Sequence, residues 1–176
     1  MAIGLLQQTL YNASMQVTIG VLTVLGACGV NEREDLINNA AVRALGEAGY
    51  TSIVTRTVTD EFTTLKNAIV EFCDTCDIVF TVGGVGFAEC DITPEVTATV
   101  IERQANGIAD LIRSDMHRHM ETSHMNRGIA GIRGRSLIIN LPGTAETVKE
   151  GIQTVSLLMR PMISALQGQT RIAHAG

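Results

Sequence analysis

A buried strand, a glycine-rich loop and a helix start follow one another within residues 77–95, and this order limits the possible folds most. Residues 78–82 (Ile-Val-Phe-Thr-Val) lack polar alternation, as is typical of a strand covered on both faces in a parallel sheet. Residues 83–86 (Gly-Gly-Val-Gly) permit a sharp turn and close approach of a ligand to backbone amides. Residues 93–95 (Thr-Pro-Glu) suit a helix N-terminus. We therefore expect an α/β sheet with a ligand loop, favouring phosphate, at the carboxyl end of this strand.

The glycine loop does not identify its ligand by itself. It is too short for the G-x-G-x-x-G fingerprint, and no Gly-Lys-Ser/Thr follows it. Because Gly-Gly-x-Gly also occurs in ordinary tight turns, a purely structural role stays open at this point.

The order of strand, tight loop and helix start recurs near the C-terminus. Residues 136–140 (Ser-Leu-Ile-Ile-Asn) form a second apolar strand pattern, and Leu-Pro-Gly-Thr follows at 141–144. Thr144 is a suitable N-cap, and Glu146 lies in the first turn of the helix that we expect next. A ligand with two separated polar groups would be able to bridge the two loops.

Two aspartates follow predicted strands. Asp60 comes just after the strand predicted at 51–58, and Asp91 follows the strand predicted at 78–82. If these strands are parallel neighbours, both carboxylates lie near the phosphate loop, where they suit Mg²⁺. The alternative for Asp60 is a first-turn acidic residue that favours the helix dipole.

Arginine is the side chain whose planar fork matches phosphate and carboxylate groups. Arg127, Arg133 and Arg135 lie within ten residues of one another, on a predicted short strand and turn. We expect an arginine here to meet the ligand, and the sequence does not show which one.

Histidines and cysteines carry weaker signals. His117, His119 and His124 lie close together in sequence, but their spacing does not place them on one helix face, so we expect surface or interface residues rather than a metal site. Cys73 and Cys76 form a C-x-x-C at the end of a helical segment, where redox motifs do not lie. We expect these two residues to be ordinary buried or half-buried side chains, and the four cysteines of the chain, Cys28, Cys73, Cys76 and Cys90, to be reduced thiols.

Composition excludes several classes of protein. The net charge of -5 and an aromatic content of 3% argue against nucleic-acid binding. No apolar run is long enough to cross a membrane, and the N-terminus lacks the features of a secretory signal. We expect a cytoplasmic protein with one domain at residues 17–170, an N-terminal extension at 1–16 and a C-terminal tail at 171–176.

Four segments together resemble the MogA/MoaB family of molybdenum cofactor biosynthesis. They are Thr-Val-Gly-Gly-Val-Gly at 81–86, Asp-Ile-Thr-Pro-Glu at 91–95, Asn-Arg-Gly-Ile-Ala-Gly at 126–131 and Asn-Leu-Pro-Gly at 140–143. Their order and spacing match the family, and the similarity extends over about residues 17–167. This combination is far more specific than any single motif.

The resemblance implies a three-layer α/β/α fold with a mostly parallel central sheet, assembled as a homotrimer or a hexamer. It also implies a small-molecule site that binds molybdopterin and transfers AMP from Mg-ATP to its terminal phosphate, releasing pyrophosphate. Asp60 and Asp91 match the family's catalytic and metal-binding acidic positions. The residues that we expect to bind the substrate are Gly83, Gly84, Val85, Gly86, Glu95, Arg127, Pro142, Gly143 and Thr144.

Several positions depart from the family pattern. Val85 replaces a Thr in the glycine loop, Cys90 replaces an Arg before the motif aspartate, and Leu-Gly-Ala at 25–27 replaces a charged Ser-Asp-Arg segment. Each lost donor weakens phosphate binding. Two functions therefore stay open: an active adenylyltransferase, or a non-catalytic paralogue that binds a pterin or nucleotide at a degenerate site. A flavodoxin-like module for another phosphorylated ligand is the third alternative.

Overall fold

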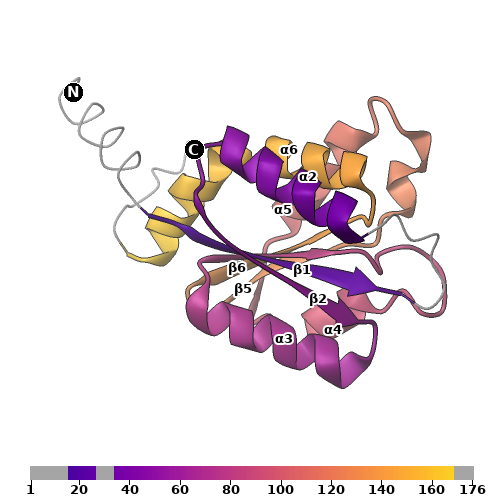
Figure 1. Cartoon of the computed structure of the whole chain (residues 1–176), viewed down its shortest axis with the longest axis horizontal. Helices are drawn as coiled ribbons and strands as arrows, with labels where there is room; N and C mark the ends of the chain where they lie inside the picture. The colour runs from indigo at the N-terminus through magenta and orange to yellow at the C-terminus, as the bar shows by residue number, and fades with distance from the viewer. Residues whose placement is uncertain (1–15, 27–33, 169–176) are drawn as a thin grey trace.

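The computed structural model describes residues 16–26 and 34–168, and the fold is built around one mixed β-sheet (Figure 1). The predicted N-terminal extension, apart from its last residue, and the C-terminal tail lie outside the described residues. Within the described ranges the sheet has six strands, in the order β2-β1-β3-β6-β5-β4. Their bounds are β1 (Thr18–Leu25), β2 (Ser52–Thr59), β3 (Ile78–Val82), β4 (Arg103–Gln104), β5 (Ala130–Arg133) and β6 (Ser136–Leu141).

The sheet is mostly parallel, as the sequence predicts. Strands β2, β1, β3 and β6 run parallel to one another. Strand β5 pairs with β6 in the antiparallel direction, and the short β4 pairs antiparallel with β5. All residues of β3 and β6 are buried, which agrees with their largely apolar sequences.

Helices cover both faces of the sheet and complete the three layers (Figure 1). One face carries α2 (Glu34–Glu47), α5 (Asn106–Met116) and α6 (Ala145–Leu166), and the other carries α3 (Phe62–Thr75) and α4 (Thr93–Ala98). Because side chains alternate along a strand, those of β3 pack into two hydrophobic cores, one on each face of the sheet. Phe80 packs with the α2, α5 and α6 side, and Val79 packs with the α3 and α4 side.

Helix α4 is shorter than the sequence predicts. The pattern indicates a helix from Glu95 to Arg103, but α4 ends at Ala98. The residues beyond it are rich in β-branched side chains, which favour strands over helices. The backbone N–H of Glu102 donates to the carbonyl of Ile132 at 2.8 Å, and the chain enters the sheet there as β4.

Helix α6 contains Pro161, a residue that is expected to kink or divide a helix. The helix is not divided, because Pro161 lies inside the continuous span Ala145–Leu166. Its inner face is buried on both sides of the proline, with Met159 and Ile163 fully covered. Tertiary packing therefore outweighs the local cost of proline.

In the described part of the chain, no helix combines the length and apolarity needed to cross a membrane.

Candidate functional site

A cavity of about 420 Å³ lies beyond the carboxyl ends of three parallel strands. Gly26 follows β1 in its lining, residues 83–86 follow β3, and residues 142–144 follow β6. This is the edge of an open α/β sheet at which ligands usually bind, and the volume is typical of small-molecule sites. The structure thus brings the two predicted loops to one cavity.

The two loops touch through their glycines. The backbone N–H of Gly83 donates to the carbonyl of Leu141 at 2.9 Å. A Cβ on Gly143 would lie 3.1 Å from the Cα of Gly83, and a Cβ on Gly83 would lie 2.9 Å from the carbonyl oxygen of Val24. Gly83 also has φ 102°, a conformation that side chains disfavour. The close approach of the loops therefore requires glycine.

Thr93 has a different role from the N-cap that the sequence predicts. Ile92 holds the cap position of α4, and no side chain caps the helix there. The Thr93 hydroxyl instead donates to the carbonyl of Gly83 at 2.9 Å, while its backbone N–H donates to the carbonyl of Gly84 at 3.0 Å. Thr93 therefore holds the glycine loop in place.

The two predicted catalytic aspartates are placed differently. Asp91 lines the cavity, and its Oδ2 accepts a 2.9 Å hydrogen bond from the backbone N–H of Ala88. Asp60 is not among the described lining residues. Its Oδ2 lies 3.7 Å from where a Cβ on Gly26 would sit, which places it directly behind that part of the lining.

Our expectation that the strands before Asp60 and Asp91 are neighbours is wrong, because β1 lies between β2 and β3. The chain crosses from β2 over β1 to reach β3, and strand order of this kind is not encoded in the local pattern. Two strand spacings amount to about 10 Å.

Arg127 and Glu95 lie behind the glycine loop and are not among the described residues of the cavity lining. The Nε of Arg127 donates to the carbonyl of Gly86 at 2.6 Å, and its other nitrogens donate to the carbonyl of Asp91 and to the Glu95 carboxylate. Partial burial raises the pKa of Glu95, but the hydrogen bond and the positive charge of Arg127 lower it by a larger amount. The pKa of Glu95 therefore lies below its usual value. Direct contact of either side chain with a ligand stays a prediction.

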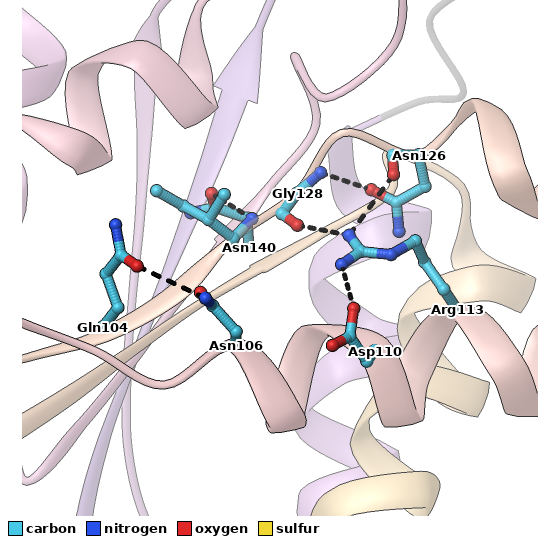
Figure 2. A network of polar contacts seen from close by, with 8 residues as sticks. Gln104, Asn106, Asp110, Arg113, Asn126, Gly128 and Asn140 are labelled. Atoms are coloured by element: carbon cyan, nitrogen blue, oxygen red, sulfur yellow. Dashed lines mark hydrogen bonds and ion pairs between the residues drawn. The ribbon is translucent and has the colours of Figure 1, made fainter.

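A polar network holds the segment that carries Arg127 (Figure 2). Arg113 on α5 donates to the carbonyls of Gly128 at 2.7 Å and Asn126 at 3.4 Å, and it pairs with Asp110. The side-chain oxygen of Asn126 accepts from the backbone N–H of Gly128 at 2.8 Å. Sequence analysis missed Arg113, for which the only local signal is an acidic residue three positions earlier on the same helix.

One wall of the cavity comes from the end of α5 and the segment after it, where the sequence predicts three surface or interface histidines. Met116, the last residue of α5, lines this wall together with Met120, Ser123 and Met125, and the last two lie on the 3₁₀ helix η1 (Glu121–Met125). The rings of His117 and His124 lie against each other with their centroids 4.1 Å apart. Among the described residues there is no group of three or more His, Cys, Asp or Glu side chains suited to a metal ion.

The cysteines divide into two kinds. Cys73 and Cys76 are free thiols, and burial raises both pKa values, that of Cys73 to about 12. Cys90 lines the cavity and is disulfide-bonded, with its partner outside the described residues. The expectation of reduced thiols therefore holds for Cys73 and Cys76 and is wrong for Cys90.

Comparison with known proteins finds relatives that match most of the chain. The family described as "Probable molybdopterin binding domain" matches residues 17–164. The chain is 35% identical over 141 residues to the molybdopterin adenylyltransferase of Helicobacter pylori, which covers 78% of this chain and 80% of that protein. It is 31% identical over 146 residues to the molybdenum cofactor synthesis protein cinnamon of Drosophila melanogaster. That alignment covers 81% of this chain but only 24% of the fly protein.

Solved structures of similar proteins share the fold of this chain over most of its length. The molybdopterin biosynthesis enzyme MoaB from Thermus thermophilus superposes with a TM-score of 0.78 at 31% identity, covering 86% of this chain and 97% of that one. The molybdopterin biosynthesis Mog protein from Mycobacterium ulcerans has a TM-score of 0.78 at 25% identity, covering 89% of this chain and 100% of the other.

Proposed function

Because this chain belongs to the molybdopterin-binding domain family of MogA and MoaB proteins, we propose that it binds molybdopterin and transfers AMP from Mg-ATP to the terminal phosphate of that pterin. The observation that carries the proposal is the single cavity that combines the glycine loop, Asp91 and residues 142–144. The relative in Helicobacter pylori that carries the name molybdopterin adenylyltransferase supports the same reaction.

The proposed reaction forms one phosphoanhydride and breaks another. An oxygen of the molybdopterin phosphate attacks the α-phosphorus of ATP, and the bond from that phosphorus to the oxygen bridging the β-phosphate breaks. Pyrophosphate leaves with the electron pair of that bond. Reactions of this kind need positioning and charge stabilisation rather than a protein nucleophile. We assign contact with the phosphate oxygens to the backbone amides of residues 84–86, since the Gly83 N–H is already bonded to Leu141.

Mg²⁺ fits the oxygen donors that the two aspartates offer. Asp91 lies in the cavity lining, and Asp60 lies behind Gly26 at its edge. Mg²⁺ prefers one or two carboxylates combined with substrate phosphates and water. We propose that these two residues hold the ion, which would supply positive charge to the phosphates when bound.

A second candidate function is ligand binding without transfer. Val85 is 4% exposed and lines the cavity, so it places methyl groups where the family resemblance has a threonine hydroxyl. Gly26, next to Asp60, likewise contributes no side-chain donor. These two positions favour a paralogue that keeps the pocket and lacks the chemistry.

One assay separates the two candidates. Purified protein is incubated with molybdopterin and Mg-ATP, and adenylylated molybdopterin is measured by mass spectrometry. Product at a useful rate supports the enzyme, whereas tight molybdopterin binding without product supports the paralogue. Asp60→Asn and Asp91→Asn should abolish turnover while the protein stays folded, and Asp74→Asn on α3, away from the cavity lining, is the matched control. Full turnover by either site variant would contradict the assigned roles.

We further propose that the protein is a cytoplasmic homotrimer or hexamer, following the family resemblance. Light scattering coupled to size exclusion measures the mass directly, and a monomer at micromolar concentration would contradict the assembly. Fractionation of cells that express the chain tests its location.

A further inference from the structure

Ser123 has a buried hydroxyl that no group in the described part of the chain satisfies. The residue is 3% exposed, and its side-chain oxygen has no hydrogen-bond partner there. Ser123 nevertheless lines the cavity. Buried polar groups are nearly always hydrogen-bonded, so an orphan at the wall of a ligand cavity points to a partner supplied by the ligand.

A local structural role does not account for this side chain. The backbone N–H of Ser123 already donates to Met120 at 3.1 Å, and its carbonyl already accepts from Asn126 at 3.1 Å. The N-cap of η1 is Met120, which makes no side-chain cap bond. The turn is therefore closed by backbone groups, and the hydroxyl contributes nothing to it.

Ser136 shows how this fold treats a serine with a structural role. It is also 3% exposed, and its hydroxyl bonds to the carbonyls of Cys73 and Cys76, both at 2.7 Å. The other buried orphan in the described residues is Glu150 Oε2. Glu150 is outside the described cavity lining, and its other oxygen lies 3.9 Å from His119. Ser123 thus differs from Ser136, whose hydroxyl is hydrogen-bonded, and from Glu150, which does not line the cavity.

The wall around Ser123 is suited to a flat ring. Met116 at the end of α5, Met120 and Met125 lie within ten residues of one another and line the same cavity. Methionine side chains adapt to the shape of a ligand, and their sulfur atoms make favourable contacts with aromatic rings. A single hydroxyl among such side chains is the usual way in which an apolar pocket fixes the orientation of a ring.

We propose that Ser123 is a specificity-determining residue that hydrogen-bonds the polar edge of a fused nitrogen heterocycle held against the methionine wall. This inference rests on the proposed function, because both molybdopterin and ATP carry such a ring. The phosphate end of the same ligand lies at the glycine loops. Whether the ring is the pterin or the adenine is decided by the experiment.

The test measures dissociation constants for molybdopterin and for AMP separately, with inorganic pyrophosphate as a ligand that has no ring. Ser123→Ala should weaken binding of the ring ligand that contacts it by about 3- to 10-fold, which is the usual effect of one hydrogen bond. Pyrophosphate binding should not change. Loss for molybdopterin alone assigns the pterin, and loss for AMP alone assigns the adenine.

Thermal unfolding of the ligand-free protein separates this role from a structural one. Ser123→Ala removes an unsatisfied hydroxyl, so its Tm should equal or exceed that of the wild type. Ser136→Ala is the matched control, and it should lower the Tm without changing affinity for the ring ligand. Ser123→Cys keeps a similar volume with a weaker donor, and it should bind more weakly than the wild type even if the alanine variant does not fold.

The failures of the two proposals are distinguishable. If the wild type binds both ring ligands and the Ser123 variants bind them equally well, only the role of Ser123 is overturned. A lower Tm for Ser123→Ala with unchanged affinity also overturns that role, because it assigns a structural one. If the wild type binds neither ring ligand, the proposed function fails and the inference fails with it.

Discussion

The hydroxyl of Thr93 donates a 2.9 Å hydrogen bond to the carbonyl oxygen of Gly83, ten residues earlier in the chain. Both residues are buried. The bond joins the first residue of α4 to the loop that lines the cavity, so the position of the helix and the shape of the loop are coupled. A Cβ on Gly84 would lie 2.4 Å from the same hydroxyl, which leaves room only for glycine there.

Thr93→Val removes this hydroxyl and keeps the side-chain shape. The Gly83 carbonyl would be left buried without that donor, so we expect a loss of about 1–3 kcal/mol in the free energy of unfolding. Urea denaturation measures the loss, and faster amide exchange at residues 83–86 should accompany it. Thr93→Ser keeps the donor and should keep the exchange protection. Unchanged stability and exchange in the valine variant would show that the bond is unimportant.

Arg127 is the second residue that fixes the glycine loop. Its guanidinium serves two carbonyls and one carboxylate, and an ammonium on a flexible chain cannot match that planar arrangement. We expect Arg127→Lys to lower the free energy of unfolding by about 1–2 kcal/mol, measured by urea denaturation, and to raise amide exchange between Gly86 and Asp91.

Glu95→Gln is the control for the Arg127 variant. The ion pair is partly exposed, with side-chain exposures of 31% for Arg127 and 52% for Glu95. Its charge should therefore contribute only about 0–1 kcal/mol. Equal effects of the two substitutions would mean that the ion pair, and not the bonds to the carbonyls, holds the loop.

Burial controls the reactivity of the C-x-x-C. It raises the pKa of the Cys73 thiol to about 12, against a smaller opposite effect of Arg133, and it also raises the pKa of Cys76. Since the thiolate is the reactive form, neither residue should be alkylated by iodoacetamide at pH 8 in the folded protein. Peptide mapping by mass spectrometry measures this, with the urea-unfolded protein as the positive control. Rapid alkylation of the folded chain would contradict the burial of these thiols.

The sequence predicts those features of the site that depend on neighbouring residues. Thr144 does cap α6, with its side chain accepting from the backbone N–H of Thr147, as its position before the helix indicates. The unbroken apolar run at 78–82 does form a buried strand that ends in the glycine loop. Each of these depends on side chains within a few positions of one another, so the pattern alone contains the information.

Features that depend on strand order or on distant partners are not predictable in this way. The insertion of β1 between β2 and β3 separates the strands that precede Asp60 and Asp91, and Asp60 lies behind Gly26 rather than among the described lining residues. Arg127 finds its acceptors 32 to 41 positions earlier in the chain, and nothing near it in sequence indicates them. Ser123 is one polar residue among several in the sequence, and only the fold places it at the cavity wall.

Glu61 should make the stability of the fold depend on pH in the acidic range. Glu61 holds the N-cap of α3. Hydrogen bonds from the Thr64 hydroxyl and from the backbone N–H groups of Thr63 and Thr64 lower the pKa of Glu61 from 4.5 to about 2. A lowered pKa in the folded state means that the carboxylate stabilises the protein above pH 4.5 and that this contribution is lost as the pH falls toward 2.

Glu61→Gln should therefore flatten the decline of stability between pH 4.5 and pH 2, and it should lower stability at pH 7, where the wild-type carboxylate is charged and bonded. Urea midpoints measured across this range in both proteins test the expectation. The exposed Glu89→Gln on the loop before Asp91 is the control, since Glu89 caps no helix in the described structure. A Glu61→Gln profile parallel to that of the wild type would show that the cap does not titrate with folding.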